Sequence, residues 1–411
     1  MSEASRTRVE LRRLRALALP ATIFTVVYFG MLVYPPLRLA DLLWPTWQPG
    51  TPTLLGLILL PILGRVAYEL RPGAASRHLA ALSLTWLGLA FLLFCVLVPF
   101  ELVALVVTAE SRTLGMSVAG LWLLLGGWSL VNAQRLTVKR MTLEAGPLTR
   151  PVRMVQISDV HIGSRGGAFL DRVVSRIEPL APDLVMITGD LVDFRDIPLE
   201  TLAPLGRLQV PLYFCIGNHE RYVDCDDICE RLRSVGVRVL REEIDLALPP
   251  LVIVGLDDAD SRHRVRDGLA ALGPLPEGYR ILLYHRPDGL EDAADAGVDL
   301  MLCGHTHNGQ IIPFNFLVRR VFPRILGLYR IAPTQLYVSP GTGTWGPVMR
   351  LGSSNEITVI ELVPGPEGSR RANGPPARAR EAAKRSRLLP ATHFRAPASL
   401  SSASTASAMR R

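Results

Sequence analysis

The sequence has few cysteines and no disulfide framework. Its cysteines number five, an odd count, and they are scattered along the chain. Cys225 and Cys229 lie close together, but no second Cys or His pair follows them. This usage is typical of a reducing compartment, and it does not favour a cysteine-based metal site.

Other signals are missing as well. No internal repeat is evident, and no small-residue cleavage site follows the first apolar run, which argues against a secretory signal peptide. The net charge is +8, yet no basic patch interleaved with aromatic residues lies between residues 150 and 362. Much of the positive charge sits near the two ends instead, at residues 6–15 and 370–411. We therefore expect contact with anionic lipid surfaces and no nucleic-acid partner.

What the sequence has in excess is apolar residues. They make up 49% of the 411 residues and are concentrated before residue 135. Four runs there are apolar on all faces, as in membrane spans: 16–34, 53–68, 79–107 and 114–131. The sequence thus predicts a basic N-terminus at residues 1–15 and a region of about four transmembrane helices at residues 16–135.

Positive residues orient these spans. Outside the N-terminus they concentrate in the loop between the second and third runs and just after the fourth run: Arg65, Arg71, Arg77, Arg135, Lys139 and Arg140. Four spans then place the N-terminus, this loop and everything after residue 135 in the cytoplasm. The chain is expected to be a multi-pass protein of the inner or plasma membrane. An odd number of spans would put the remainder of the chain on the other side.

From about residue 150 the chain alternates short apolar runs with segments of helical spacing. One such helix is expected at 169–180, with apolar residues at Leu170, Val173, Val174 and Ile177. This alternation predicts a layered α/β architecture. The last strand is expected at 357–362, and residues 363–411, rich in Pro, Gly, Ala, Ser and Arg, are expected to form a disordered basic tail.

Five apolar runs in this part end in Asp, Asn or His, at the strand ends where α/β proteins build their sites. The residues are Asp159 and His161, Asp190, Asn218 and His219, His285, and His305 and His307. At a spacing of two on an extended chain, Asp159 and His161 project to the same side. Mixed His, Asp and Asn donors suit Mn, Fe or Zn better than Mg.

The order D-x-H, G-D, G-N-H-E, a single His and G-H-x-H resembles the calcineurin-like metallophosphoesterases over residues 150–362. Residues 337–343 and 355–357 are similar to the membrane-associated branch, that of the bacterial transmembrane metallophosphoesterases and UDP-2,3-diacylglucosamine pyrophosphatase-like enzymes. The resemblance implies a four-layer α/β/β/α sandwich, with two packed sheets and helices outside. It also implies hydrolysis of a phosphoester or pyrophosphate bond.

The resemblance assigns roles to the motif residues. One metal ion would be bound by Asp159, His161, Asp190 and His307, and a second by Asp190, Asn218, His285 and His305. A water bridging the two ions would be the nucleophile. His219 would be a catalytic residue that faces the substrate phosphate and either stabilises the transition state or protonates the leaving oxygen.

Neighbouring polar residues are assigned supporting roles. Asp193, Glu220 and Asp288 would orient the ligands, and Arg165 and Arg221 would reach the substrate phosphate. After the last ligand, residues 311–331 combine apolar side chains with four arginines. This segment is too short and too charged to span a membrane, and its composition is typical of an interfacial segment. A loop and helix packed on the core would explain the same pattern.

The leading hypothesis is a membrane-anchored phosphoesterase with two divalent ions that acts on a phosphorylated, lipid-linked substrate at the membrane surface. Membrane lipids are its other expected partner, and no protein partner is identified. Two alternatives stay open. One is a tethered general phosphodiesterase or phosphatase acting on soluble nucleotides, and the other is a membrane sensor that binds phosphate without turnover.

Overall fold

The computed structural model describes residues 25, 28–107, 110–246, 248–331 and 333–365. The basic N-terminus, most of the first expected span and nearly all of the expected tail lie outside the described residues. Within the described part, the chain divides into two compact units, with the boundary between Gly127 and Trp128.

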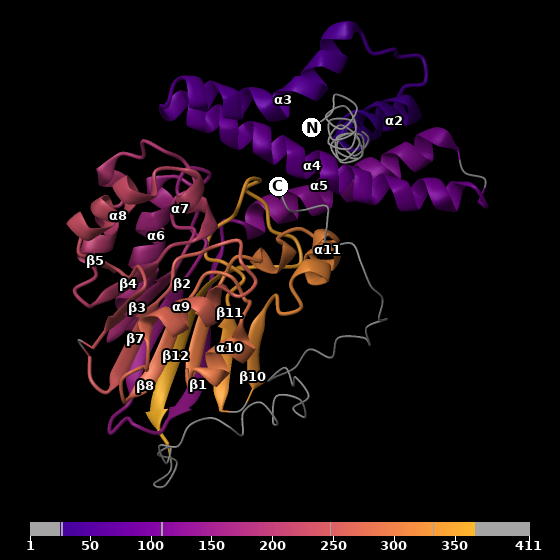
Figure 1. Ribbon diagram of the computed structural model, residues 1–411. Helices are drawn as coiled ribbons and strands as arrows, with labels where there is room; N and C mark the ends of the chain where they lie inside the picture. Colours follow the sequence, from indigo (N-terminus) through magenta and orange to yellow (C-terminus); the bar gives the residue numbers. More distant parts are fainter. Residues whose placement is uncertain (1–24, 26–27, 108–109, 247, 332, 366–411) are drawn as a thin grey trace, which may run out of the picture. The chain divides into compact units, whose positions relative to one another are not determined.

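The first unit is helical. It contains α2 (Tyr34–Leu43), α3 (Thr51–Leu70), α4 (Ala74–Ala104) and most of α5 (Ser111–Asn132) (Figure 1). Among the described residues, α3, α4 and α5 are long and apolar enough to cross a membrane. They coincide with the second, third and fourth expected spans. Inside this unit Arg38 Nε donates to Glu101 Oε1 at 2.7 Å, so this carboxylate within the apolar helix α4 is paired.

The second unit contains two mixed sheets. The first has the strand order β1-β12-β2-β3-β4-β5. Its strands are β1 (Leu136–Ala145), β2 (Val152–Ile157), β3 (Leu184–Thr188), β4 (Leu212–Cys215), β5 (Val237–Val239) and β12 (Asn355–Pro364). The strands from β2 to β5 are parallel, and β12 runs antiparallel to β2.

The second sheet has the order β10-β11-β9-β8-β7-β6. Its strands are β6 (Glu243–Asp245), β7 (Leu251–Gly255), β8 (Tyr279–Leu283), β9 (Leu300–Cys303), β10 (Gly327–Ile331) and β11 (Thr334–Val338). The central strands β7, β8, β9 and β11 are parallel, whereas β6 and β10 pair antiparallel at the two edges.

The main core lies between the sheets. Alternate residues of the first sheet, such as Met154 and Met186, pack with residues of the second, such as Ile253, Ile281 and Leu302. The opposite face of the second sheet is covered by α9 (Arg264–Leu272) and α10 (Leu290–Asp295) (Figure 1). In the central strands β2, β3 and β4 of the first sheet nearly all residues are buried, and the apolar stripe of α6 (Gly167–Ile177) is buried too. The expected α/β fold of two packed sheets with outer helices is confirmed.

The shorter elements complete the unit. Two helices follow β4, namely α7 (Asn218–Tyr222) and α8 (Cys225–Ser234), and α11 (Phe314–Val321) follows β9. Short 3-10 helices are η1 (Glu178–Leu180), η2 (Leu199–Thr201), η3 (Ala203–Arg207) and η4 (His307–Gly309).

Strand β1 was missed by the sequence analysis, which starts this domain at residue 150. It pairs in parallel with β12 at the edge of the first sheet, and only residues 133–135 separate it from the end of α5. Most of its residues are exposed or half-buried, and it carries Lys139, Arg140 and Glu144. Such an edge strand has no continuous apolar run to signal it.

Candidate metal centre

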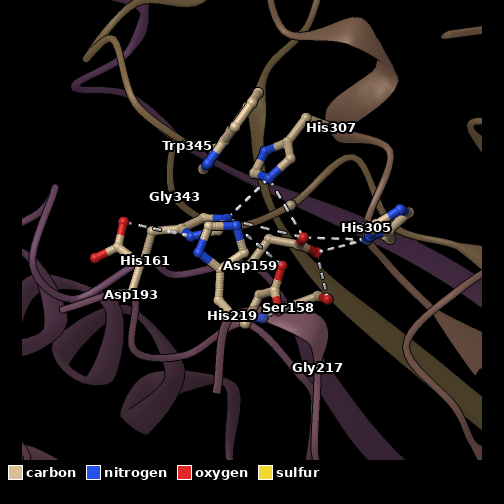
Figure 2. Close-up of polar contacts among 12 residues, drawn as sticks. Ser158, Asp159, His161, Asp193, Gly217, His219, His305, His307, Gly343 and Trp345 are labelled. Atoms are coloured by element: carbon tan, nitrogen blue, oxygen red, sulfur yellow. Dashed lines mark hydrogen bonds and ion pairs between the residues drawn. The ribbon is translucent and has the colours of Figure 1, made fainter. Parts of the chain in front are cut away.

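The predicted ligands follow the carboxyl ends of five strands. Asp159 and His161 follow β2, Asp190 follows β3, Asn218 and His219 begin α7 after β4, His285 follows β8, and His305 and His307 follow β9. Since β2, β3 and β4 are parallel neighbours, and β8 and β9 are too, the loops of each sheet leave at one edge. The side chains of Asp159, His161, His219 and His307 converge there (Figure 2).

One group of potential ligands contains Asp159, His161 and His307, all buried, whose donor atoms lie within 4.8 Å of one another. The Nε2 atoms of His161 and His307 are 2.9 Å apart. His307 Nε2 is also 3.3 Å from Asp159 Oδ1. Two imidazole nitrogens and a carboxylate oxygen around one point are a donor set for a divalent transition metal.

A second group contains Asp190, His285 and His305, again with donor atoms within 4.8 Å. His285 Nε2 lies 3.0 Å from Asp190 Oδ2 and 3.2 Å from His305 Nδ1. Asn218 Oδ1 is buried and has no hydrogen-bond partner among the described residues. A buried amide oxygen without a partner is costly unless a cation or another donor satisfies it. The residues of the two groups and Asn218 therefore fit the divalent metal ions that the resemblance implies.

His219 lies beside both groups. Its Nε2 is 4.0 Å from Asp190 Oδ2, and its ring centroid is 4.7 Å from that of His161. Its backbone N–H donates to Asp190 Oδ1 at 2.9 Å. His219 is half-buried, so one side of the imidazole can meet a ligand from solvent.

Two acidic residues hold the ligand loops. Glu220 is fully buried and accepts three backbone N–H bonds, from Asp190 at 3.0 Å, Val192 at 2.9 Å and Gly217 at 2.9 Å. Asp193 accepts from the backbone N–H and the hydroxyl of Ser164. Its Oδ2 also lies 3.6 Å from His161 Nδ1. Both residues are thus placed to orient ligands.

The other residues predicted to support the site, Asp288, Arg165 and Arg221, lie outside the two ligand groups. Asp288 follows His285 in the loop before α10, where burial raises the pKa of its carboxyl. Arg165 is buried, donates to the carbonyl oxygen of Ala133 and stacks on the ring of Phe169. Arg221 pairs with Asp258 at 2.7 Å and with Asp260 at 3.1 Å. Contact of either arginine with substrate stays a prediction.

The backbone at the ligands is unusual. Five ligand candidates have φ in the left-handed region: Asp159 (54°), His161 (56°), Asp190 (52°), His305 (74°) and His307 (49°). For residues with a side chain this conformation costs on the order of 1 kcal/mol or more each, and it persists where the surroundings enforce it. Its concentration at these positions indicates a site whose ligands are held in place by the fold.

Electrostatics favour the metal-binding forms of His305, His307, Asp159 and Asp190, but without a bound cation they favour the protonated form of His285. Burial lowers the pKa of His305 to about 3 and that of His307 to about 4, so both imidazoles are neutral near pH 7. Burial alone would raise the pKa values of the Asp159 and Asp190 carboxyls, but the neighbouring histidines lower both below the usual range. At His285 burial opposes ionisation, yet the Asp190 carboxylate raises its pKa to about 10.

The sequence analysis missed two residues near the site. Trp345 is 51% exposed, and its ring lies 6.2 Å from that of His219 at the rim of the site. Its backbone N–H donates to Gln310 Oε1 at 2.9 Å. Arg350 is fully buried beside His307. A lone tryptophan and a lone arginine carry no sequence spacing that signals such positions.

Comparison with known proteins gives a consistent result. Residues 152–309 match the family model described as calcineurin-like phosphoesterase. A Danio rerio "Transmembrane protein with metallophosphoesterase domain" is 37% identical over 51% of this chain and 53% of its own length. An "Uncharacterized metallophosphoesterase" of Aquifex aeolicus is 35% identical over 58% of this chain and 96% of its own length.

A third relative is "Phosphodiesterase YaeI" of Escherichia coli, which is 32% identical over 52% of this chain and 83% of that protein. The chain spans about half the length of the zebrafish relative, whereas it covers nearly all of the Aquifex relative. The aligned portions thus amount to just over half of this chain.

Proposed function

The chain belongs to the calcineurin-like metallophosphoesterases; from that premise we propose that it is a phosphate-ester hydrolase, anchored in a membrane, that uses two metal ions and acts on a lipid-linked substrate. It cleaves a phosphoester or pyrophosphate bond at the membrane surface with two divalent ions, Mn, Fe or Zn. The observation that carries the two-metal proposal is that two groups without a shared residue, Asp159, His161 and His307 and Asp190, His285 and His305, each bring their donor atoms within 4.8 Å of one another.

The proposed ligands divide between these groups. Asp159, His161 and His307 would hold one ion, and Asn218, His285 and His305 would hold the other. Asp190 is assigned to both sets, because its Oδ2 lies 3.0 Å from His285 Nε2 and its carboxylate interacts electrostatically with His161 and Asp159 of the first set. When bound, two divalent ions would neutralise phosphoryl charge and supply a hydroxide nucleophile near neutral pH.

The chain's own residues then act on the substrate. Burial lowers the pKa of His219, so this imidazole is neutral at pH 7. It donates a hydrogen bond to a phosphoryl oxygen as negative charge develops there. The backbone N–H bond from His219 to Asp190 fixes the imidazole relative to the ligands. The exposed ring of Trp345 forms one wall for the substrate beside His219.

The membrane location follows from different observations. Three described helices are able to cross a bilayer, and relatives of this chain are named transmembrane proteins. With the four spans expected from the sequence, the positive-inside rule puts the second unit in the cytoplasm. A phosphorylated lipid of the cytoplasmic leaflet is then the substrate that we propose.

The test is hydrolysis by the detergent-solubilised full chain, loaded with Mn²⁺ or stripped with a chelator. UDP-2,3-diacylglucosamine is offered beside soluble phosphomonoester and phosphodiester reporters, with His219→Ala as control. Metal-dependent cleavage that strongly favours the lipid is the expected result. Cleavage of the soluble esters alone would overturn the lipid-linked substrate, and metal binding without turnover of any ester would favour a sensor.

A second candidate function is a tethered phosphodiesterase for soluble nucleotides. It is favoured by the similarity to the Escherichia coli relative, whose name states a phosphodiesterase. In that case the apolar helices serve as an anchor, and solubilised enzyme would hydrolyse soluble diesters as fast as lipid-linked ones.

A further inference from the structure

Helix α11 presents apolar side chains to solvent. None of its eight residues is buried. Phe316, Leu317 and Val321 are 64%, 60% and 52% exposed. Phe314 and Val318 lie on the half-buried side, so the helix rests on the unit with one apolar side and turns another outward. A surface helix in water normally shows polar residues on its outer face.

Two flanking residues extend this surface. Ile312 precedes the helix and is 41% exposed, and Leu326 follows it and is 37% exposed. Together with Phe316, Leu317 and Val321 they form what we call the α11 surface. Clustered exposed apolar residues of this kind mark contact with a protein, a ligand or a membrane.

The charge around the α11 surface has one sign. Residues 311–331 contain four arginines and no acidic residue. Arg324 is paired with Glu291. Arg319 and Arg320 are exposed, and in the described part of the chain neither pairs with a carboxylate. Exposed arginines beside apolar side chains complement an anionic lipid surface better than a second copy of this basic segment.

The α11 surface is joined directly to the metal centre. The ring of Phe322, which ends the helix, lies 4.9 Å from the ring of His305. Gln310, just before the segment, binds the backbone of Trp345 through both atoms of its amide. A ligand or surface that binds to α11 therefore lies close to the edge of the metal centre.

We propose that the α11 surface docks on an anionic lipid bilayer. Phe316, Leu317 and Val321 enter the acyl boundary, about 5–10 Å below the headgroups, while Arg319 and Arg320 bind lipid phosphates. A bilayer is the occupant that fits, because the same chain carries three helices able to cross one. Docking would let the phosphate of an amphiphile reach the ligands while its acyl chains stay in the bilayer. That last consequence rests on the proposed function, whereas docking itself does not.

The direct test places a fluorophore on the helix. The full chain with Cys225→Ser and Phe316→Cys is labelled with an environment-sensitive dye and reconstituted in vesicles of phosphatidylglycerol and phosphatidylcholine. Doxyl-labelled lipid serves as the quencher. Arg233→Cys, at an exposed position on α8, is the matched control. The dye at position 316 should shift to shorter wavelength and be quenched at least threefold more than at position 233. Equal quenching at the two positions would overturn the proposal.

Further variants and a crosslinking experiment test the role of the arginines and the alternative of a second copy. Arg319→Glu with Arg320→Glu should lower quenching at position 316 several-fold, whereas Arg176→Glu, an exposed arginine on α6, should not. Quenching unaffected by the double substitution would remove the role of the arginines. Crosslinks between copies through position 316, without quenching by lipid, would assign the surface to a second copy instead.

The labelled protein is also measured with His219→Ala, because docking needs no turnover. Quenching that survives in this variant separates docking from catalysis, so a failure of the proposed hydrolysis would leave the docking result intact. With an active enzyme, the double arginine substitution should lower turnover of a lipid-linked ester at least fivefold and leave a soluble reporter unchanged. Equal losses on both substrates would contradict a role in presenting lipid.

Discussion

The guanidinium of Arg350 lies against the imidazole of His307, with 3.3 Å between Nη2 and Nδ1. Both residues are buried. Arg350 Nη1 also donates to the carbonyl oxygen of His307 at 3.0 Å, Nη2 to that of Gly343 at 2.6 Å, and Nε to Asn355 Oδ1 at 2.9 Å. One side chain thus joins the loop after β9, the loop after β11 and the start of β12.

The backbone of Arg350 extends this network to the end of α5. Its N–H donates to the carbonyl oxygen of Ser129 at 3.0 Å, and its carbonyl oxygen accepts from Asn132 Nδ2 at 3.1 Å. These α5 residues belong to the second unit, although the helix begins at Ser111 in the first. Arg350 therefore contacts both His307, a proposed metal ligand, and the last turn of the apolar helix α5.

We expect Arg350→Lys to weaken metal binding at least tenfold. Lysine keeps the charge but lacks the planar fork that contacts three loops, and the loss of residues that orient ligands typically costs 10–100-fold in affinity. The unfolding free energy should fall by about 2 kcal/mol because buried acceptors lose their donors. Metal titration and thermal unfolding check this, with the exposed Arg207→Lys as control. Unchanged metal affinity would show that Arg350 only supports the fold.

Asp190→Asn should remove metal and activity together. Asp190 belongs to the second ligand group and is proposed as a ligand of both ions, and an amide has one metal-binding oxygen where the carboxylate has two. Its backbone N–H bond to Glu220 is unaffected, so the fold should be retained. Elemental analysis after gel filtration gives the metal content, and Asp171→Asn, on α6 with its side chain 50% exposed, is the control. A full metal load in the variant would disprove the assignment of Asp190 to both ions.

His219→Ala should have the opposite signature. Metal content is expected to stay at the wild-type level, because the ligand groups remain intact, while kcat falls about 10²–10⁴-fold. His219→Gln tests the reason, since its amide N–H can still donate a hydrogen bond and should restore part of the rate. A turnover equal to that of the wild type would exclude His219 from the reaction, and metal loss would make it a ligand.

The sequence predicted that the proposed ligands follow the strand ends because the local pattern determines that position; their role as metal ligands stays a prediction. Asp159, Asp190 and His285 each follow an apolar run, and parallel strands bring such loops to one edge whatever the remaining sequence. Arg350 and β1 could not be found in this way. The burial of Arg350 depends on the carbonyl oxygen of His307 in the loop after β9 as well as on acceptors near Arg350 in the sequence, and β1 is an exposed edge strand without an apolar run. Long-range contacts of this kind leave no periodic trace in the sequence.

Trp345→Ala should act mainly on substrate binding. The ring is half exposed beside His219, and the ring of Tyr222 lies 5.9 Å from His219 as well, so aromatic surface is available to the leaving group. Loss of about 1.4 kcal/mol of contact would raise KM about tenfold with little change in kcat. Trp345→Phe should retain most of the affinity. Steady-state kinetics on the preferred ester check this, and a fall in kcat alone would place Trp345 in the chemical step.

Glu220→Gln should weaken metal binding although it leaves the side chain of every proposed ligand unchanged. The carboxylate accepts backbone N–H bonds from Asp190, Val192 and Gly217, and a glutamine would turn an N–H₂ group toward at least one of these donors. An unsatisfied buried N–H costs about 1–3 kcal/mol, so the melting temperature should fall and the loop carrying Asp190 should shift. We expect metal affinity to drop about tenfold by titration. Glu230→Gln, exposed on α8, should change neither quantity. Wild-type metal affinity in a destabilised Glu220→Gln protein would mean that Glu220 serves the fold alone.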